Sequence, residues 1–221
     1  MTTTAVGATV SGSGATPAGP RQLRICVVGD ELVAGTGDPR SLGWVGRVGA
    51  RTERGVATST MFPLGVPDET TADLLARWHV ETARRFEGSQ PGERHLVIGL
   101  GRHDVYELVS LPRSRLNLAN MLDEATARGL PTFVVGPPPG PDERLNARIG
   151  ELSGAFADVC VRRHVPYVDT FTPLVAHEDW LTDLAGGDGR HPGQAGYGLI
   201  AWLVLHGGWH TFLGLRDADT A

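Results

Sequence analysis

The chain has 221 residues, of which 41% are hydrophobic, with 25 acidic and 20 basic side chains and a net charge of −5. This length predicts one domain whose core needs no disulfide or metal to hold it together. The mild acidity argues against nucleic acid or an anionic membrane surface as a partner, because both attract clustered positive charge. All 20 basic residues are arginine. The absence of lysine excludes Schiff-base chemistry through a lysine amine and a phosphate loop of the Walker type.

The first 20 residues are uncharged and rich in Thr, Ala, Gly, Ser and Pro, and we expect them to form a disordered extension. They lack the basic segment and long apolar stretch of a secretory signal, and no later window approaches the roughly 18 apolar residues of a membrane span. We therefore expect a single domain over residues 21–215, followed by a tail over 216–221. Cys26 and Cys160 are expected to be buried thiols in a reducing cytoplasm.

Short β-branched runs predict five buried strands, in chain order Leu23–Val28, a weaker one near Ala57–Phe62, His95–Leu100, Thr132–Val135 and Val165–Val168. Amphipathic patterns predict the intervening helices, which are Thr70–Phe86, Leu116–Arg128, Arg144–Arg163 and one from Pro192 to about Leu205. Strands alternating with helices predict an α/β fold with a mainly parallel sheet that is covered on both faces. Such sheets carry their functional residues in the loops beyond the carboxyl ends of the strands.

We expect most aromatic and histidine side chains outside these loops to have structural roles. Trp44, Trp78 and Trp202 fit core-facing positions, whereas Trp180 and Trp209 are expected in loops, where one of them could line a pocket. The remaining histidines considered are expected to be packing or surface residues; they are His79, His95 and His164.

Four polar or glycine-rich segments follow the predicted strands or precede the last helix. They are Gly29–Gly35 (GDELVAG), Leu64–Thr71 (LGVPDETT), Gly101–Asp104 (GRHD) and Asp188–Pro192 (DGRHP). In order and spacing they resemble the four motif blocks of the SGNH (GDSL) hydrolase family, and the similarity extends from about Leu23 to Leu205. The resemblance implies a flavodoxin-like three-layer α/β/α sandwich with a mainly parallel five-stranded sheet.

The resemblance also implies which positions form the active site. In the family the first block supplies a nucleophilic serine, the second a glycine and the third an asparagine of the oxyanion hole, and the last an Asp–His pair. Gly65, Asp188 and His191 match this pattern. The nucleophile position holds Glu31 and the asparagine position holds His103. Ordinary serine-esterase chemistry at position 31 is therefore not expected, since glutamate has no hydroxyl and an acyl-enzyme through it would be an anhydride.

Glu31 and Asp188 are instead expected to flank His191 with two carboxylates, which favours the protonated imidazole. His191 then becomes a candidate general acid, with Glu31 as base or as electrostatic stabiliser of positive charge. His103 and Gly65 remain candidate oxyanion or substrate-binding groups. A histidine satisfied within its own loop is an equal alternative for His103. Ser41 is another hydroxyl nearby, but nothing in its spacing recommends it as a nucleophile.

Two further aspartates and a metal hypothesis complete the candidate site. Asp30 can contact substrate, although both Asp30 and Asp104 are more simply interpreted as residues that hold their loops through backbone hydrogen bonds. The carboxylates and histidines also invite a metal site, but no HxH or HExxH spacing supports one. We expect no metal and no cofactor.

Two functions remain open from the sequence. The first is an enzyme that acts on a small oxygenated molecule through Glu31, His191 and Asp188, either by hydrolysis with activated water, including opening of an epoxide or lactone, or by cyclisation or elimination. The second is a ligand-binding or regulatory protein of the same fold that has lost catalysis. Retention of the Asp188–His191 pair favours the enzyme.

Overall fold

Five parallel strands form the centre of the molecule in the spatial order β2-β1-β3-β4-β5. The structure is a computed structural model that describes residues 20–52, 57–87 and 92–215. The strands are β1 (Arg21–Gly29), β2 (Ala57–Gly65), β3 (Glu93–Gly99), β4 (Thr132–Val135) and β5 (Tyr167–Val168). Residues 1–19 of the expected extension and the expected tail over 216–221 lie outside the described residues.

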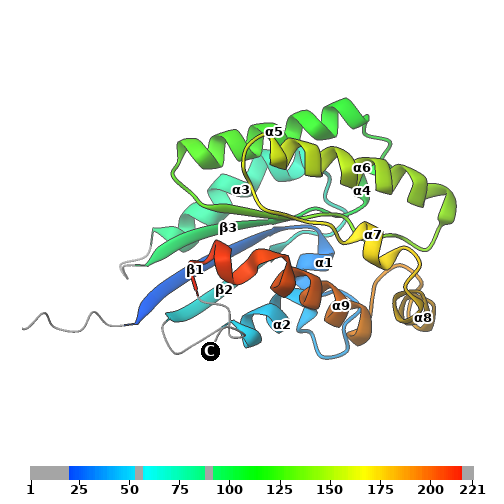
Figure 1. Cartoon of the computed structure of the whole chain (residues 1–221). Coiled ribbons are helices and arrows are strands. Elements are labelled where there is room, and N and C mark those ends of the chain that lie inside the picture. Colours follow the sequence, from blue (N-terminus) through cyan, green and yellow to red (C-terminus); the bar gives the residue numbers. More distant parts are fainter. Residues whose placement is uncertain (1–19, 53–56, 88–91, 216–221) are drawn as a thin grey trace, which may run out of the picture.

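Helices cover both faces of the sheet (Figure 1). On one face lie α3 (Thr71–Phe86), α4 (His103–Tyr106), α5 (Leu111–Ala127) and α6 (Glu143–Val161). On the other lie α1 (Glu31–Ala34), α2 (Gly43–Arg51), α8 (Glu178–Gly186) and α9 (Gln194–Val204), which is followed by a kinked segment over Leu205–Trp209 and by α10 (His210–Phe212). A short helix, α7 (Phe171–Leu174), follows β5. The three-layer α/β/α fold with five strands is as predicted, and the sheet, expected to be mainly parallel, is parallel throughout.

Alternation along the strands divides the hydrophobic core into two parts. In β1, Ile25 and Val27 pack under α2 and α9, whereas Val28 faces the layer of α3, α5 and α6. Successive strand side chains point to opposite faces, so a continuous apolar run is needed where both faces are covered. In α3, Leu74 and Trp78 are four residues apart and both face the sheet, below 2% exposed.

The boundaries of several elements differ from the prediction. The fifth strand contains only Tyr167–Val168, and α5 begins at Leu111, five residues earlier than predicted. The last helix begins at Gln194 instead of Pro192 and follows Gly193 as its N-cap. The helix ends at Val204, and the chain that follows is kinked at Gly207 and Gly208, whose backbone angles are not helical.

The tryptophans give the clearest correction. Trp202, expected on a core face, is 56% exposed and stacks on His206 with ring centroids 4.2 Å apart. The buried stripe of α9 passes instead through Tyr197, Ile200, Ala201 and Val204, and Trp202 lies off this stripe. Trp180 and Trp209, expected in loops, lie within α8 and at the end of the kinked segment after α9, and both are fully buried.

Cys26 and Cys160 are both buried free thiols, as predicted. Of the helices described, none combines the length and apolar character that crossing a membrane requires. The cytoplasmic location stays a prediction.

Candidate active site

Three glycines end neighbouring strands and bring the first three motif blocks together. Gly29 of β1 is in register with Gly65 of β2 and with Gly99 of β3. A Cβ atom on Gly29 would overlap the Gly99 carbonyl, and one on Gly65 would overlap the Asp30 carbonyl. Glycine is therefore required for this close backbone approach, which places the loops that follow beside one another.

Glu31 is the first residue of α1 and lies buried at the carboxyl end of the sheet, 4% exposed. Asp30 precedes it as the N-cap, with its Oδ1 accepting a hydrogen bond of 2.9 Å from the Leu32 N–H. The Nε2 of His103 lies 2.8 and 3.0 Å from the two carboxylate oxygens of Glu31. The backbone N–H of Asp68 donates to Oε2 of Glu31 at 3.0 Å.

These contacts create a buried ion pair. Burial disfavours the charged form of Glu31, but the hydrogen bond from His103 and further backbone hydrogen bonds outweigh it and lower the pKa of Glu31 to about 2. For His103, burial likewise opposes the charge, and the carboxylate of Glu31 outweighs it, so the pKa of His103 is raised. The arrangement is therefore a carboxylate paired with an imidazole whose protonated form is favoured.

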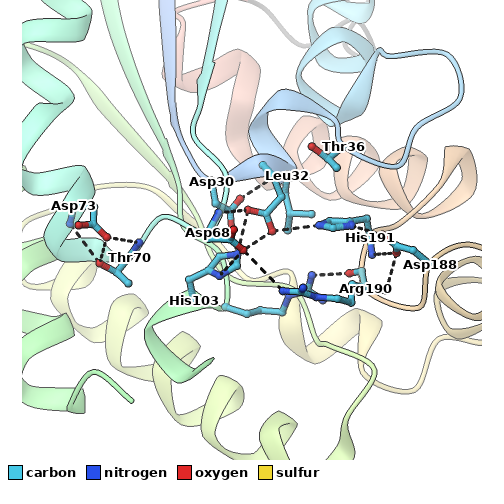
Figure 2. A network of polar contacts seen from close by, with 12 residues as sticks. Asp30, Leu32, Thr36, Asp68, Thr70, Asp73, His103, Asp188, Arg190 and His191 are labelled. Atoms are coloured by element: carbon cyan, nitrogen blue, oxygen red, sulfur yellow. Dashed lines mark hydrogen bonds and ion pairs between the residues drawn. The ribbon is translucent and has the colours of Figure 1, made fainter. Parts of the chain in front are cut away.

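His191 approaches Glu31 from a different loop, just before α9. Its Nε2 lies 3.4 Å from Oε1 of Glu31, and its Nδ1 lies 2.6 Å from Oδ2 of Asp188. Oδ1 of Asp188 accepts from the backbone N–H groups of Arg190 and His191, both at 2.8 Å, which fixes the turn. The expected placement of His191 between two carboxylates is thus present. Figure 2 shows Asp30, Asp68 and His103 on one side of the site and Asp188, Arg190 and His191 on the other.

Asp30 contributes a second buried carboxylate beneath the ion pair. Its Oδ2 is buried without a hydrogen-bond partner and lies 3.9 Å from the Nε2 of His103. Burial, together with the neighbouring Glu31 charge, raises the pKa of Asp30 to about 7. A Cβ atom on Gly101 would overlap this oxygen, so the third block also needs its glycine for close packing.

The oxyanion candidates His103 and Gly65 are both in contact with other protein groups. His103 directs its Nε2 at Glu31, while its Nδ1 lies 3.8 Å from the exposed carboxylate of Asp68. Gly65 packs its backbone against Asp30 and Ala34. The roles of Gly65, His103 and Asp30 toward a substrate stay predictions.

Asp104 has the structural contacts expected of a loop-holding residue. Its two carboxylate oxygens accept hydrogen bonds of 2.7 Å from the backbone N–H and the hydroxyl of Thr71, at the start of α3. Asn117 donates to the same hydroxyl at 2.9 Å. These contacts tie α3, α4 and α5 together behind the site.

Three residues near the site were not identified from the sequence. Asp68 adopts a left-handed backbone with φ of 58°, which aims its N–H at Glu31. Arg102 is 2% exposed and donates a hydrogen bond to the carbonyl of Arg190 at 2.7 Å. Asp68 lies in the second block, where an aspartate that tolerates a left-handed turn is a weak signal. No sequence signal identifies Arg102 or Arg190, because their contacts join segments that are 88 residues apart.

Asp30, Glu31 and His103 each place a potential ligand atom within 4.8 Å of the others. Two carboxylates and one imidazole can ligate a divalent cation. A cation bound there would have to replace the hydrogen bonds between His103 and Glu31. Our expectation of no metal stays a prediction.

An all-parallel sheet between two helical layers, with an Asp–His pair whose histidine faces the second residue after the first strand, is the arrangement of an SGNH-type hydrolase. The model of the GDSL-like lipase/acylhydrolase family matches residues 27–199, and the chain belongs to this family. Family membership and fold support an enzyme of the hydrolase class. None of the curated proteins matches the chain.

Solved structures share the fold at low sequence identity. A lipase/acylhydrolase from Enterococcus faecalis is 24% identical with a TM-score of 0.71, covering 87% of this chain and 97% of its own. The structure of TesA is 23% identical with a TM-score of 0.67, covering 84% and 97%. Axe2, an acetylxylan esterase from Geobacillus stearothermophilus, is 16% identical with a TM-score of 0.69, covering 88% and 96%. At these identities the likeness concerns the fold.

Proposed function

We propose that the chain is a hydrolase-fold enzyme that acts on a small oxygenated substrate by acid/base chemistry through Glu31, His191 and Asp188, without a serine acyl-enzyme. The observation that carries this proposal is the carboxylate of Glu31 between two imidazoles, 2.8 Å from His103 and 3.4 Å from His191. Position 31 offers no hydroxyl to acylate, whereas the proton-handling pair of the family is assembled.

The geometry favours different roles for His191 and Glu31. His191, oriented by Asp188, is the group that exchanges a proton with water or a substrate hydroxyl through its Nε2. Glu31, whose pKa is lowered to about 2, is a poor base and acts instead as a fixed negative charge that stabilises positive charge on His191. The same exchange serves hydrolysis by activated water, including opening of an epoxide or lactone, and cyclisation or elimination.

A ligand-binding or regulatory protein is the second candidate. It is favoured by the number of protein groups already bonded to Glu31, namely His103 twice and the Asp68 N–H. In that case the site has become a rigid polar cluster. Replacing His191 by alanine separates the two candidates, since it removes the proton carrier from an enzyme but leaves a binding protein with full biological activity.

Replacing Glu31 by Gln tests the enzymatic proposal. Ester, lactone and epoxide panels are assayed with the natural chain and with E31Q, and E107Q serves as the matched control because Glu107 is an exposed residue at the end of α4. We expect E31Q to abolish turnover and E107Q to retain it. Full activity in E31Q would overturn the proposal, and absence of turnover by the natural chain would favour the binding protein.

A further inference from the structure

Arg102 is a buried guanidinium that joins three loops at the carboxyl end of the sheet. It follows β3 in the third motif block and is 2% exposed. One guanidinium nitrogen donates to the Pro139 carbonyl at 3.1 Å, in the loop between β4 and α6. The other donates to the Arg190 carbonyl at 2.7 Å, in the loop before α9.

The charge of Arg102 acts on the buried carboxyl of Asp30 and opposes the rise of its pKa, but Arg102 forms no direct ion pair with it. Among the ion pairs within 4.0 Å in the described part of the chain, Arg102 does not occur. The ring of Tyr106 lies 5.9 Å from the guanidinium carbon and offers a cation–π contact. Burying a cation on carbonyl acceptors and one aromatic ring is a costly way to connect loops. The burial of Arg102 therefore suggests a role in function.

The sequence neighbours of the two bonded residues indicate this role. Arg102 precedes His103, and Arg190 precedes His191. The two histidines contact the same carboxylate, that of Glu31, from separate loops. The loop before α9, which contains His191, carries side chains that are largely exposed, with Asp188 at 55% and Arg190 at 58%. A hydrogen bond from Arg102 to the Arg190 backbone thus restrains this loop one residue away from His191.

We propose that Arg102 is a positioning residue that holds the His191 loop against the Glu31–His103 pair. It acts through the Arg190 backbone and needs no contact with substrate. The catalytic meaning of this restraint rests on the proposed function, but the restraint itself can be measured without turnover.

The experiment follows the histidine side chains by NMR in protein labelled with ¹⁵N-histidine, with signals assigned by H191A. The variants are Arg102→Met, which removes both hydrogen bonds, and Arg190→Ala, which leaves the accepting carbonyl in place. We expect the side-chain signals of His191, including the Nδ1 proton shared with Asp188, to shift or broaden in R102M and to remain in R190A. His95, buried near the opposite end of β3, should be unaffected in both.

Unchanged His191 signals in R102M overturn the proposal. The proposal is also overturned if folded R102M loses the signals of all histidines, including His95, because such a loss indicates a general structural role for Arg102. If R102M fails to fold, R102K keeps the charge but cannot reproduce the planar fork of two N–H donors. We then expect the His191 signals to move in R102K, and unchanged signals would again overturn the proposal.

Turnover separates this inference from the proposed function. On any substrate that the natural chain converts, R102M should lower kcat by about 10- to 100-fold with little change in KM, since small misplacements of catalytic groups cost rate more than binding. An inactive E31Q with undisturbed His191 in R102M refutes the positioning role alone. An active E31Q with displaced His191 in R102M refutes the proposed function alone.

Discussion

The Nε2 of His103 lies 2.8 and 3.0 Å from the two carboxylate oxygens of Glu31, so the two residues that depart from the GDSL pattern contact each other. Where the family has a hydroxyl and an amide, this chain has a carboxylate and an imidazole in contact with each other. The imidazolium stabilises the buried carboxylate, and the carboxylate raises the pKa of the imidazole. We therefore expect that neither replacement is well accommodated alone.

This pairing predicts that the stability effects of the two positions are not additive. Removing one member of a buried ion pair leaves an uncompensated charge and costs about 3–5 kcal/mol. We expect E31S and H103N each to lose stability of that order, and the double variant E31S/H103N to lose less than the sum. The free energy of unfolding of all four proteins is measured in urea between pH 4.5 and pH 6.5, which are the ordinary pKa values of a glutamate and a histidine. Additive losses contradict the pairing.

The same double variant predicts a gain of activity. E31S/H103N restores the family residues beside an intact Asp188–His191 pair, so it should hydrolyse p-nitrophenyl acetate. An oxyanion donor is worth about 100-fold or more in rate, and the double variant should exceed E31S alone by roughly that factor. Adding H191A should remove the gain. A double variant no faster than the natural chain shows that the scaffold no longer supports serine chemistry.

Asp30 predicts a distinctive dependence of stability on pH. Burial, with the charge of Glu31, raises the pKa of Asp30 from 3.8 to about 7. Between these values the folded chain keeps a proton that the unfolded chain has lost, so this group makes stability fall as the pH rises. D30N keeps the oxygen that accepts from Leu32 but removes the titration. We expect the stability of D30N relative to the natural chain to increase from pH 4 to about pH 7, measured by thermal unfolding.

Asp188 provides the control of opposite sign. Hydrogen bonds from the backbone and side chain of His191 lower the pKa of Asp188. The contribution of Asp188 to the stability of the fold is therefore present above its ordinary pKa of 3.8 and is lost as the pH falls below that value. D188N should change the acid limb of the stability profile and leave the slope between pH 4 and 7 in place. A D30N profile parallel to that of the natural chain would refute the raised pKa of Asp30.

The sequence predicts the sheet and the meeting of the motif blocks because both depend on local patterns. Apolar runs such as Thr132–Val135 are strands with the predicted bounds, and the loops after β1, β2 and β3 converge because parallel strands end at one edge. The pairing of Glu31 with His103 and the hydrogen bond from Arg102 to Arg190 depend on side-chain directions across distant segments. Trp202 shows the same limit, since its exposure depends on which stripe of α9 meets the sheet.

Gly101 predicts a steric test of how tightly Asp30 is held. Alanine at position 101 would place its Cβ on the buried Oδ2 of Asp30, whose carboxylate is held by the hydrogen bond from Leu32 to Oδ1. Overpacking of this kind costs about 1–3 kcal/mol, and we expect G101A near the upper end in urea unfolding.

The matched control for this test is G154A, in α6. A Cβ there meets nothing within 4 Å, so helix propensity alone should stabilise that variant by about 0.5–1 kcal/mol. The cost of G101A should shrink in a D30A background, because the overlapping carboxylate is then absent. An equal cost in both backgrounds would show that the clash lies elsewhere, and that Asp30 is free to turn away from Gly101.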